Sequence, residues 1–449
     1  MELELEQIAK ICGGRIVGNK DIVIHGIVID SNKAHLDNLF VAIIGEVKDG
    51  HDFIPDAIKN GVRSIIVAEK FTTFMPGVTY IIVKDTTKSL GDIAHFYRMM
   101  FDIPIIAITG SNGKTTVKEM LKSICIAEYG EENVLASRSS LNNHWGMPLT
   151  LLELKPEHKI AIIEMGMNHF GELTYLTKIA VPNLAVINNV NAAHLGNFNS
   201  MDDIAKAKGE IYSGISENGI ALINDTSKYC SYWTNLIETA KIKIKYFSSV
   251  ESGYYIKSIN DNVGLFSINN EEFTIKLNIL GQHNYYNALT AITIASLFNV
   301  KIVNMIKGVA NYNGYKSRLE VKKGFNGITI VDDSYNANPD SVKAAILAIK
   351  TLPKPHWFIL GNLNELGVFS IDKHREIGLF AKENGIDRLI TIGSDTLYTI
   401  ESFGENAFYF NNKKEIIAYC KNNLPSTGVL LIKASNSLKL WEISDALGV

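Results

Sequence analysis

The feature that most constrains the fold is an apolar segment that runs into a glycine-rich loop and then into a helical pattern. The apolar segment, residues 105–108, has the length and β-branched residues of a buried strand. The loop reads Thr-Gly-Ser-Asn-Gly-Lys-Thr-Thr at 109–116, and the helical pattern starts at Val117. Glycines let backbone N–H groups converge on an anion, and a helix N-terminus adds partial positive charge. The sequence therefore predicts a phosphate-binding loop and an ATP site.

Two side chains of this loop have distinct predicted roles. Lys114 is placed to reach the outer phosphates of ATP, and the Thr115 hydroxyl is placed to hold Mg²⁺. The general phosphate-loop pattern has a further glycine at position 108, where this chain has Ile. A plain glycine turn between a strand and a helix is the alternative interpretation. The other cofactor-binding candidates of the loop are Gly110, Ser111, Asn112, Gly113 and Thr116.

Length and composition are those of an ordinary globular chain, and they limit the classes of partner that we expect. A chain of 449 residues is too long for one core and suggests about three domains. Its net charge of -3 does not favour nucleic acid as a partner. Its four cysteines form no CxxC pair, so neither zinc nor a disulfide framework is expected. No apolar run approaches the roughly 20 residues that span a bilayer, and the acidic N-terminus lacks a signal peptide's basic region. We expect a cytoplasmic monomer that acts on small molecules, with no membrane contact.

Strand-like and helix-like segments alternate along the chain, which indicates an α/β fold in three domains. Residues 1–100 form a small α/β unit, 101–313 a central doubly wound sheet of the phosphate-loop ATPase type, and 314–449 a second doubly wound, Rossmann-like unit. Apolar runs such as 160–164 and 185–188 are typical of parallel strands buried on both faces. Ligands in such folds bind at the carboxyl edge of the sheet.

Three polar residues lie at the ends of these strands or in a helical pattern further along the chain, and each has a less specific alternative. Glu164 ends a predicted strand beside the phosphate loop, where a carboxylate is suited to Mg²⁺. His194 follows the next strand, and Lys208 lies in a helical pattern. Taken alone, each has a simpler explanation: Glu164 as a cap, His194 as a loop histidine and Lys208 as a solvated lysine.

Two further clusters are candidates for contact with the nucleotide. Asn284 and Asn287 share one face of the helix expected over 288–298, where an amide could serve a purine edge and Asn284 could cap the helix. Asp333 follows a predicted strand in the last segment and suits a ribose hydroxyl. A carboxylate that caps the next turn explains Asp333 as well.

Together these motifs resemble the Mur ligase family over the whole chain, and most closely its members that add D-alanyl-D-alanine to a UDP-linked muramoyl tripeptide. The specific segments are 109–116, 164–168, 204–211, His283-Asn284 with Asn287, and 332–339. In this family the phosphate loop lacks the first glycine, so Ile108 fits the resemblance.

The resemblance implies an ATP-dependent amide ligase that activates a carboxylate as an acyl phosphate, which an amine then displaces. It implies a UDP-sugar domain, an ATPase domain and a mobile C-terminal domain, in that order. Lys114 would hold the phosphates, Thr115 and Glu164 one Mg²⁺, and His194 a second. Lys208 aligns with a carbamylated lysine that serves as a metal ligand. Asn284 and Asn287 would face adenine, while Arg318 and Asp333 would reach ATP from the third domain.

The substrate half departs from the family pattern at several positions. Asn32 and Asn436 stand where the family usually has arginine, and Ser139-Ser140 stands where it usually has a Gly-Asn pair. Asn362 and Ala434 replace an expected Asp and Gly. Asparagine cannot supply the charge and five donors of arginine. These departures have two explanations. Either the sequence has drifted and Lys33 or Lys439 supplies the missing charge, or the protein is a paralogue that joins another acid and amine. An ATP-binding protein without ligase chemistry is a third hypothesis, which the retained Lys114, Glu164, His194 and Lys208 disfavour.

Overall fold

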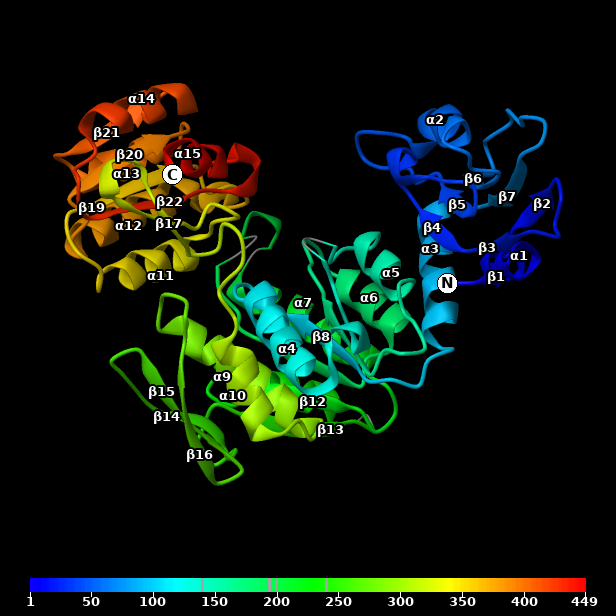
Figure 1. Cartoon of the computed structure of the whole chain (residues 1–449), viewed down its shortest axis with the longest axis horizontal. Coiled ribbons are helices and arrows are strands. Elements are labelled where there is room, and N and C mark those ends of the chain that lie inside the picture. Colours follow the sequence, from blue (N-terminus) through cyan, green and yellow to red (C-terminus); the bar gives the residue numbers. More distant parts are fainter. Residues whose placement is uncertain (139–140, 193–194, 199, 239–240) are drawn as a thin grey trace.

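The computed structural model describes residues 1–138, 141–192, 195–198, 200–238 and 241–449. Three α/β units follow one another along the chain, each with its own sheet (Figure 1). The predicted α/β class is confirmed. The division near residues 100 and 313 stays a prediction, although each of the three large sheets lies within one of those ranges.

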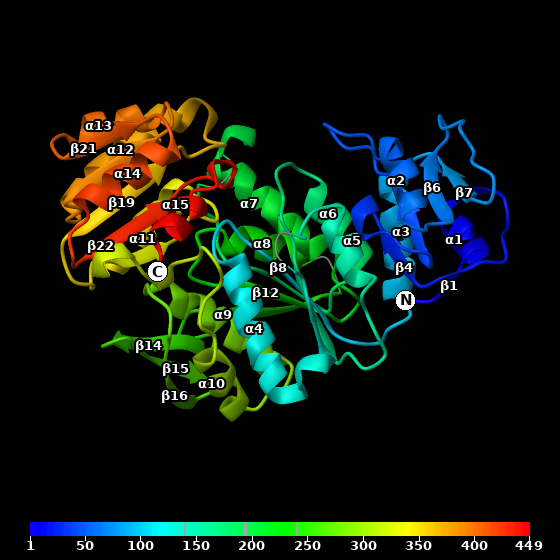
Figure 2. The same cartoon turned by 45° about the horizontal axis from the view of Figure 1, so that its top comes forward.

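The N-terminal unit is built on a five-stranded sheet of order β2-β7-β6-β5-β4, in which β2 alone is antiparallel to its neighbour. Strands β4 to β7 are therefore parallel, and α3 continues from β7 toward the central unit (Figure 2). The elements are β1 Leu3–Glu4, α1 Leu5–Cys12, β2 Arg15–Val17, β3 Val23–Ile24, β4 Gly26–Val28, β5 Asn38–Val41, α2 Ile54–Lys59, β6 Ser64–Ala68, β7 Thr79–Val83 and α3 Thr86–Arg98. His51, expected to be a packing residue, accepts a hydrogen bond from the Ala68 N–H at Nε2.

The central sheet is entirely parallel and has the order β13-β12-β11-β8-β10-β9. After β8 the chain first builds β9 and β10 on one side and then crosses to β11 on the other, so a crevice forms at the carboxyl end of β8. The strands are β8 Ile105–Thr109, β9 Val134–Ala136, β10 Ile160–Glu164, β11 Leu184–Ile187, β12 Ile220–Asn224 and β13 Lys243–Phe247. The phosphate loop follows β8 and therefore lies in this crevice.

Helices cover both faces of the central sheet. Ile106 and Ile108 on one face of β8 share an apolar core with α4, α9 and α10, while Ile105 and Ala107 on the other face pack with α5, α6 and α7. This two-sided burial confirms the prediction for the parallel strands. The helices are α4 Lys114–Tyr129, α5 Gly146–Leu151, α6 Glu172–Ala180, α7 Met201–Gly209, α8 Cys230–Ile237, α9 His283–Leu297 and α10 Ile302–Ala310.

A three-stranded antiparallel sheet, β14-β15-β16, is attached beside α9 and α10 (Figure 1). Its strands are Tyr254–Asn260, Val263–Ile268 and Glu271–Lys276. Two-residue turns join them, at Asp261-Asn262 and Asn269-Asn270, and all four turn residues have positive φ. This sheet was not expected from the sequence.

The C-terminal unit has a sheet of order β17-β18-β22-β19-β20-β21 in which only β17 is antiparallel. Helices α11 to α13 pack on one face, and α14 and α15 pack on the other. The elements are β17 Glu320–Lys323, β18 Thr329–Asp332, α11 Pro339–Ile349, β19 His356–Gly361, α12 Ser370–Glu383, β20 Arg388–Ile392, α13 Thr396–Phe403, β21 Ala407–Phe410, α14 Lys413–Asn423, β22 Val429–Lys433 and α15 Trp441–Leu447. The doubly wound arrangement agrees with the expected class.

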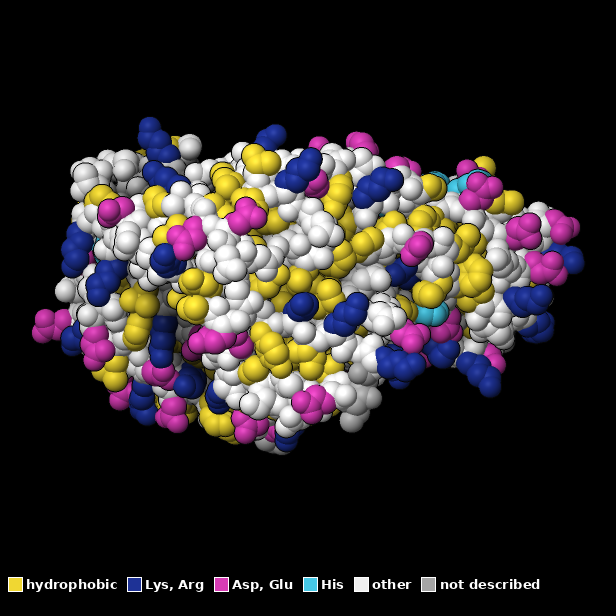
Figure 3. Space-filling view, turned by 90° about the horizontal axis from the view of Figure 1, so that it is seen from below, with side chains coloured by type: hydrophobic (Ala, Val, Ile, Leu, Met, Phe, Trp, Pro, Cys, Tyr) yellow, Lys and Arg dark blue, Asp and Glu magenta, His cyan; other side chains and the backbone are white. Residues whose placement is uncertain are grey.

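The surface shows no segregation of charge on the face drawn in Figure 3, where basic and acidic side chains alternate along the molecule. No helix in the described part of the chain is long and apolar enough to cross a membrane. All four cysteines are free.

One local expectation is wrong. The cap of α9 is Gln282 rather than Asn284, and Gln282 makes no side-chain capping hydrogen bond. Asn284 lies within the first turn and donates from Nδ2 to the Leu280 carbonyl at 2.6 Å. Helix α9 therefore begins at His283, five residues before the expected start.

Candidate active site

The phosphate loop leaves β8 and reaches α4 through two glycines with positive φ, Gly110 at 152° and Gly113 at 77°. Only glycine adopts such angles without strain. A Cβ built on Gly113 would lie 2.4 Å from Asn287 Oδ1 and 2.7 Å from Asn188 Nδ2. Gly113 is therefore required both by its backbone angle and by the side chains that press against it.

Asparagine amides from the segment after β11 and from α9 support the loop from behind. Asn189 Oδ1 accepts the Asn112 N–H at 2.8 Å, and the Nδ2 groups of Asn188 and Asn189 donate to the Asn112 carbonyl at 3.0 and 2.8 Å. Asn188 also donates to Asn287 Oδ1 at 2.8 Å. Asn188 and Asn189 were not predicted as site residues, because an Asn pair after a strand also suits an ordinary loop.

The predicted adenine residues are part of this support. Asn287 Nδ2 donates to Asn284 Oδ1 at 2.9 Å, and both residues are buried. Their amides connect Leu280, Asn188 and the underside of Gly113. They line the cavity beside the loop, and their contact with adenine stays a prediction.

Lys114 stands at the first residue of α4 and is half-buried. Its Nζ donates to the Gly110 carbonyl at 2.7 Å and reaches the Ser111 carbonyl at 3.5 Å. Burial lowers the pKa of Lys114, and nearby Glu164 partly offsets that shift. A partly desolvated ammonium at the loop is well placed to bind a phosphate, because the anion would compensate the ammonium for the water it has lost.

Glu164 and Thr115 lie together, as the metal prediction requires. Thr115 Oγ1 donates to Glu164 Oε2 at 3.0 Å, and Asn142 Nδ2 donates to Glu164 Oε1 at 2.9 Å. The buried ammonium of Lys118 donates to the Ser137 carbonyl at 2.7 Å and lies 3.9 Å from Glu164 Oε2. Lys118 and Asn142 orient the carboxylate, and neither was predicted from the sequence as a site residue.

This pair of oxygen donors fits Mg²⁺ that arrives with a nucleotide. Among the described residues no three His, Cys, Asp or Glu side chains form a ready-made metal cluster. Nucleotide-bound Mg²⁺ needs no such cluster, because phosphates and water supply most of its ligands. His194, the predicted ligand of a second metal, lies outside the described residues.

Lys208 is 2 % exposed near the end of α7, and its side chain makes no hydrogen bond or ion pair with the residues that the structure describes. Burial lowers the pKa of Lys208 well below its usual value, and the positive charge of Lys114 acts in the same direction. Burial therefore favours the neutral form of this amine.

The C-terminal unit contributes a second group of polar residues. The Arg318 guanidinium stacks on Tyr335, 4.2 Å from the ring centroid, and its Nε is buried without a hydrogen-bond partner among the described residues. Asp333 Oδ2 accepts from Lys433 Nζ at 2.5 Å, and Asp333 Oδ1 accepts from the Leu319 N–H at 3.1 Å. Asp333 thus fixes the backbone next to Arg318. Its contact with a ribose stays a prediction.

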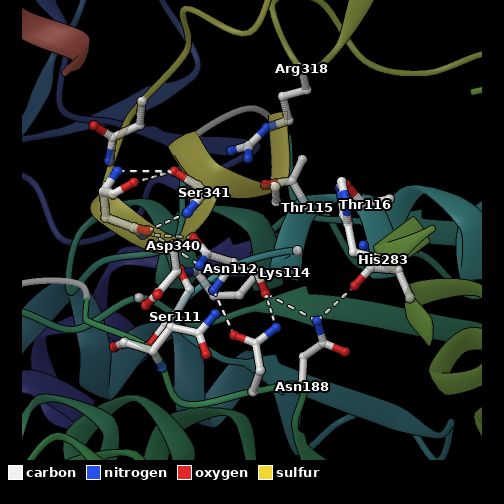
Figure 4. Close-up of a pocket in the computed structure, with 18 of the residues that line it drawn as sticks. Ser111, Asn112, Lys114, Thr115, Thr116, Asn188, His283, Arg318, Asp340 and Ser341 are labelled. Carbon is white, nitrogen blue, oxygen red and sulfur yellow. Dashed lines mark hydrogen bonds between the residues drawn. The ribbon is translucent and has the colours of Figure 1, made fainter. Parts of the chain in front are cut away.

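These residues surround one cavity of about 910 Å³ between the central and C-terminal units. Figure 4 shows Arg318 extending from above toward Thr115 and Lys114, with Ser111 and Asn112 below and Asp340 beside them. The lining includes the predicted residues Ser111, Asn112, Gly113, Lys114, Thr115, Thr116, Glu164, Asn284, Asn287, Arg318 and Asp333. Buried Lys208 is not part of this lining. The volume of the cavity, its cationic side chains and the Glu164 carboxylate, which could bind a metal ion, suit a nucleoside triphosphate.

The departures from the family pattern are also accommodated locally. Asn436 Nδ2 donates to the Tyr335 carbonyl at 2.8 Å, and Asn32 Nδ2 donates to Asp30 Oδ1 at 3.2 Å. Asn362 Oδ1 accepts the Asp395 N–H at 3.1 Å. Ala434 is buried against Gly361, which has no Cβ to oppose it. Ser139 and Ser140 lie outside the described residues.

Three family profiles match the chain in order. Residues 23–98 match "Mur ligase family, catalytic domain", residues 108–295 match "Mur ligase middle domain", and residues 317–436 match "Mur ligase, glutamate ligase domain". A UDP-N-acetylmuramoyl-tripeptide–D-alanyl-D-alanine ligase from Haemophilus influenzae is 32% identical over 100% of this chain and 98% of its own length. The chain belongs to the Mur ligase family.

Other members of the family extend the likeness to structure. The Escherichia coli ligase of the same name is 33% identical, covering 100% of this chain and 98% of its own. A crystal structure of MurF from Acinetobacter baumannii superposes with a TM-score of 0.91 at 28% identity, covering 99% of this chain and 98% of that one. The three-domain Mur ligase fold expected from the sequence is confirmed.

Gly113→Ala tests the loop geometry. We expect it to weaken ATP binding by at least about tenfold in calorimetry, because the new Cβ meets two amides and the φ of 77° is strained. Gly77→Ala is the matched control, since Gly77 has φ of 74° but no atom within 4 Å of its Cβ position. Equal ATP affinities for both variants and the unmodified chain would contradict this geometry.

Proposed function

We propose that this Mur ligase uses ATP to join UDP-N-acetylmuramoyl-tripeptide to D-alanyl-D-alanine in the synthesis of peptidoglycan precursors. The observation that carries the proposal is the likeness of the whole chain to relatives with that named activity, at 32% and 33% identity. The phosphate loop and its cavity support the use of ATP. The first unit is assigned the UDP-sugar, the central unit ATP, and the last unit the incoming amine.

The reaction follows from what the cavity residues can do. A carboxylate oxygen of the tripeptide attacks the γ-phosphorus of ATP, ADP leaves, and an acyl phosphate forms. The amine of D-alanyl-D-alanine then attacks the acyl carbon, phosphate departs, and the amine loses a proton. Lys114 and Arg318 hold phosphate charge in the first step, because both are cations in a partly desolvated cavity. The C-terminal unit shields the acyl phosphate from water.

Mg²⁺, when bound with ATP, supplies charge neutralisation and holds phosphate oxygens in place. Thr115 and Glu164 would hold one ion, and His194 would contribute to a second. Lys118 and Asn142 keep the Glu164 carboxylate ordered before the nucleotide arrives. Asn284, Asn287 and Asp333 are assigned to the nucleoside half of ATP.

The environment of Lys208 suits the carbamylation that the family resemblance implies. A neutral lysine amine attacks CO₂, forms an N–C bond and loses one proton, which leaves a carboxylate-like group on the side chain. The lowered pKa of Lys208 favours this reactive neutral form. The resulting anion would then face the positive charge of Lys114.

The carbamate predicts a specific spectroscopic signal. In ¹³C-bicarbonate the protein should show a carbamate ¹³C resonance, which Lys208→Ala should abolish together with ligase activity. Because only the neutral amine reacts, the resonance should weaken as pH is lowered through the depressed pKa. Lys206→Ala, on the same helix but half exposed, is the control and should retain the signal. An unchanged resonance in Lys208→Ala would refute the assignment.

A direct assay tests the proposed function. Purified chain with ATP, Mg²⁺, UDP-N-acetylmuramoyl-tripeptide and D-alanyl-D-alanine should release ADP and form the amide, detected by mass spectrometry, at rates of roughly 1 per second or more. Lys114→Ala should reduce this rate by at least about a thousandfold, because a phosphate cation is lost. Lys122→Ala, one turn beyond Lys118 on α4, is the control.

The same assay decides the alternative that Asn32 and Asn436 favour. Both amides are used within the protein, and neither provides the charge of an arginine for an anionic substrate. A paralogue that joins another acid and amine would leave both named substrates unreacted. It would release ADP and phosphate from ATP only when its own acid and amine are supplied.

A further inference from the structure

The first turn of α11 contacts the phosphate loop across the domain boundary. Asn338 Nδ2 donates to Asn112 Oδ1 at 2.7 Å, and Asn112 Nδ2 returns a longer contact to Asn338 Oδ1 at 3.4 Å. The two residues are 226 positions apart in the chain. The C-terminal unit therefore bonds to the tip of the loop that is assigned the phosphates of ATP.

Asn338 can make this contact because only part of its amide is used by its own helix. Asn338 Oδ1 caps α11 by accepting the Ser341 N–H at 2.9 Å, and the Asn338 N–H donates to Ser341 Oγ at 3.0 Å. The Nδ2 group takes no part in this capping box. It is the group that reaches Asn112.

The side chain of Asn112 is directed toward α11 because hydrogen bonds fix the Asn112 backbone at both its N–H and its carbonyl. Its N–H and its carbonyl are both bonded to the amides of Asn188 and Asn189. Neighbouring Ser111 Oγ donates to the Asn191 carbonyl and accepts the Asn191 N–H, each at 2.9 Å. The loop and segment 188–191 thus form one hydrogen-bonded unit.

The same turn of α11 also holds the end of that segment. Asp340 Oδ2 accepts the Ala192 N–H at 2.9 Å, next to Asn191. The first turn of α11 therefore binds the phosphate loop at Asn112 and binds segment 191–192 at Ala192, and Ser111 joins the loop to the same segment through Asn191. Figure 4 places Asp340 beside Asn112 and Ser111 at the edge of the cavity.

We propose that Asn338 and Asp340 are positioning residues that couple docking of the C-terminal domain to nucleotide occupancy of the phosphate loop. The nucleotide orders the loop from the cavity side, and α11 orders it from the domain side. Whatever stabilises one arrangement favours the other, and this coupling is reciprocal. The inference rests on the proposed function only in taking the ligand of the loop to be a nucleoside triphosphate.

The test uses variants that keep the helix cap and remove the contact. Serine at 338 still caps α11 but is too short to reach Asn112, so Asn338→Ser isolates the cross-domain bond. Asn338→Ser with Asp340→Ala removes both links. Asn412→Ser makes the same change at the N-cap of α14, where Asn412 accepts the Glu415 N–H at 3.0 Å, and serves as the matched control.

Two readouts are measured on the full chain with ADP and with a non-hydrolysable ATP analogue. We expect the double variant to bind the ATP analogue about tenfold more weakly in calorimetry. Its X-ray scattering radius with nucleotide bound should be larger than that of the unmodified chain, because the cross-domain contacts are lost. Asn412→Ser should match the unmodified chain in both. A double variant with the nucleotide affinity and the scattering radius of the unmodified chain would overturn the proposal.

A cycle with Asn112→Ala separates coupling from a general loss of stability. If the amide pair carries the effect, Asn338→Ser should weaken binding in the unmodified chain and add nothing in the Asn112→Ala background. Equal additional loss in both backgrounds would contradict the proposal. If Asn338→Ser lowers the thermal midpoint, Asp340→Ala tests the second link on its own, because it removes only the contact with the Ala192 N–H and should also weaken nucleotide binding.

Steady-state kinetics add a readout that a purely structural role would not move. In the double variant the KM for ATP should rise about tenfold while kcat changes less than about threefold, whereas partial unfolding would lower kcat alone. These binding and scattering results do not depend on which acid and amine are joined. A chain that ligates no muramoyl peptide would refute the proposed substrates and leave the coupling open to this test.

Discussion

The structure depends on the backbone of the phosphate loop being held in a conformation that only glycine permits at Gly113. Amides of Asn188, Asn189 and Asn287 press on the loop from behind and fix the Asn112 peptide. Because these side chains come from the segment after β11 and from α9, the loop is ordered by the sheet crevice and not by its own sequence alone. The N-terminus of α4 is left facing the cavity, where it favours an anion.

Charge is distributed so that neither neighbouring domain completes the site alone. The central domain supplies Lys114 and the Glu164–Thr115 pair, and the C-terminal domain supplies Arg318, held by its stacking on Tyr335. The buried Nε of Arg318 has no partner among the described residues, which suits an anion in the cavity. Reaction chemistry that needs both groups then requires the domains to be docked, and α11 makes that docking depend on the loop itself.

Much of this could be predicted from the sequence because buried parallel strands and glycine loops have local signatures. The strand at 160–164 was predicted with its bounds, and Thr115 does meet Glu164. The antiparallel β14–β16 sheet was missed because its strands alternate and are only half-buried, although its Asp-Asn and Asn-Asn turns were an available signal. The Asn112–Asn338 and Lys118–Glu164 contacts depend on tertiary packing, which spacing in one chain does not reveal.

The central claim is that ATP and a carboxylate react in this cavity to give an acyl phosphate. The most direct measurement is isotope transfer from a muramoyl tripeptide whose acceptor carboxylate carries ¹⁸O, in the complete reaction with ATP, Mg²⁺ and D-alanyl-D-alanine. The account predicts that each amide formed sends one ¹⁸O into the released phosphate. Amide formed with unlabelled phosphate would contradict it.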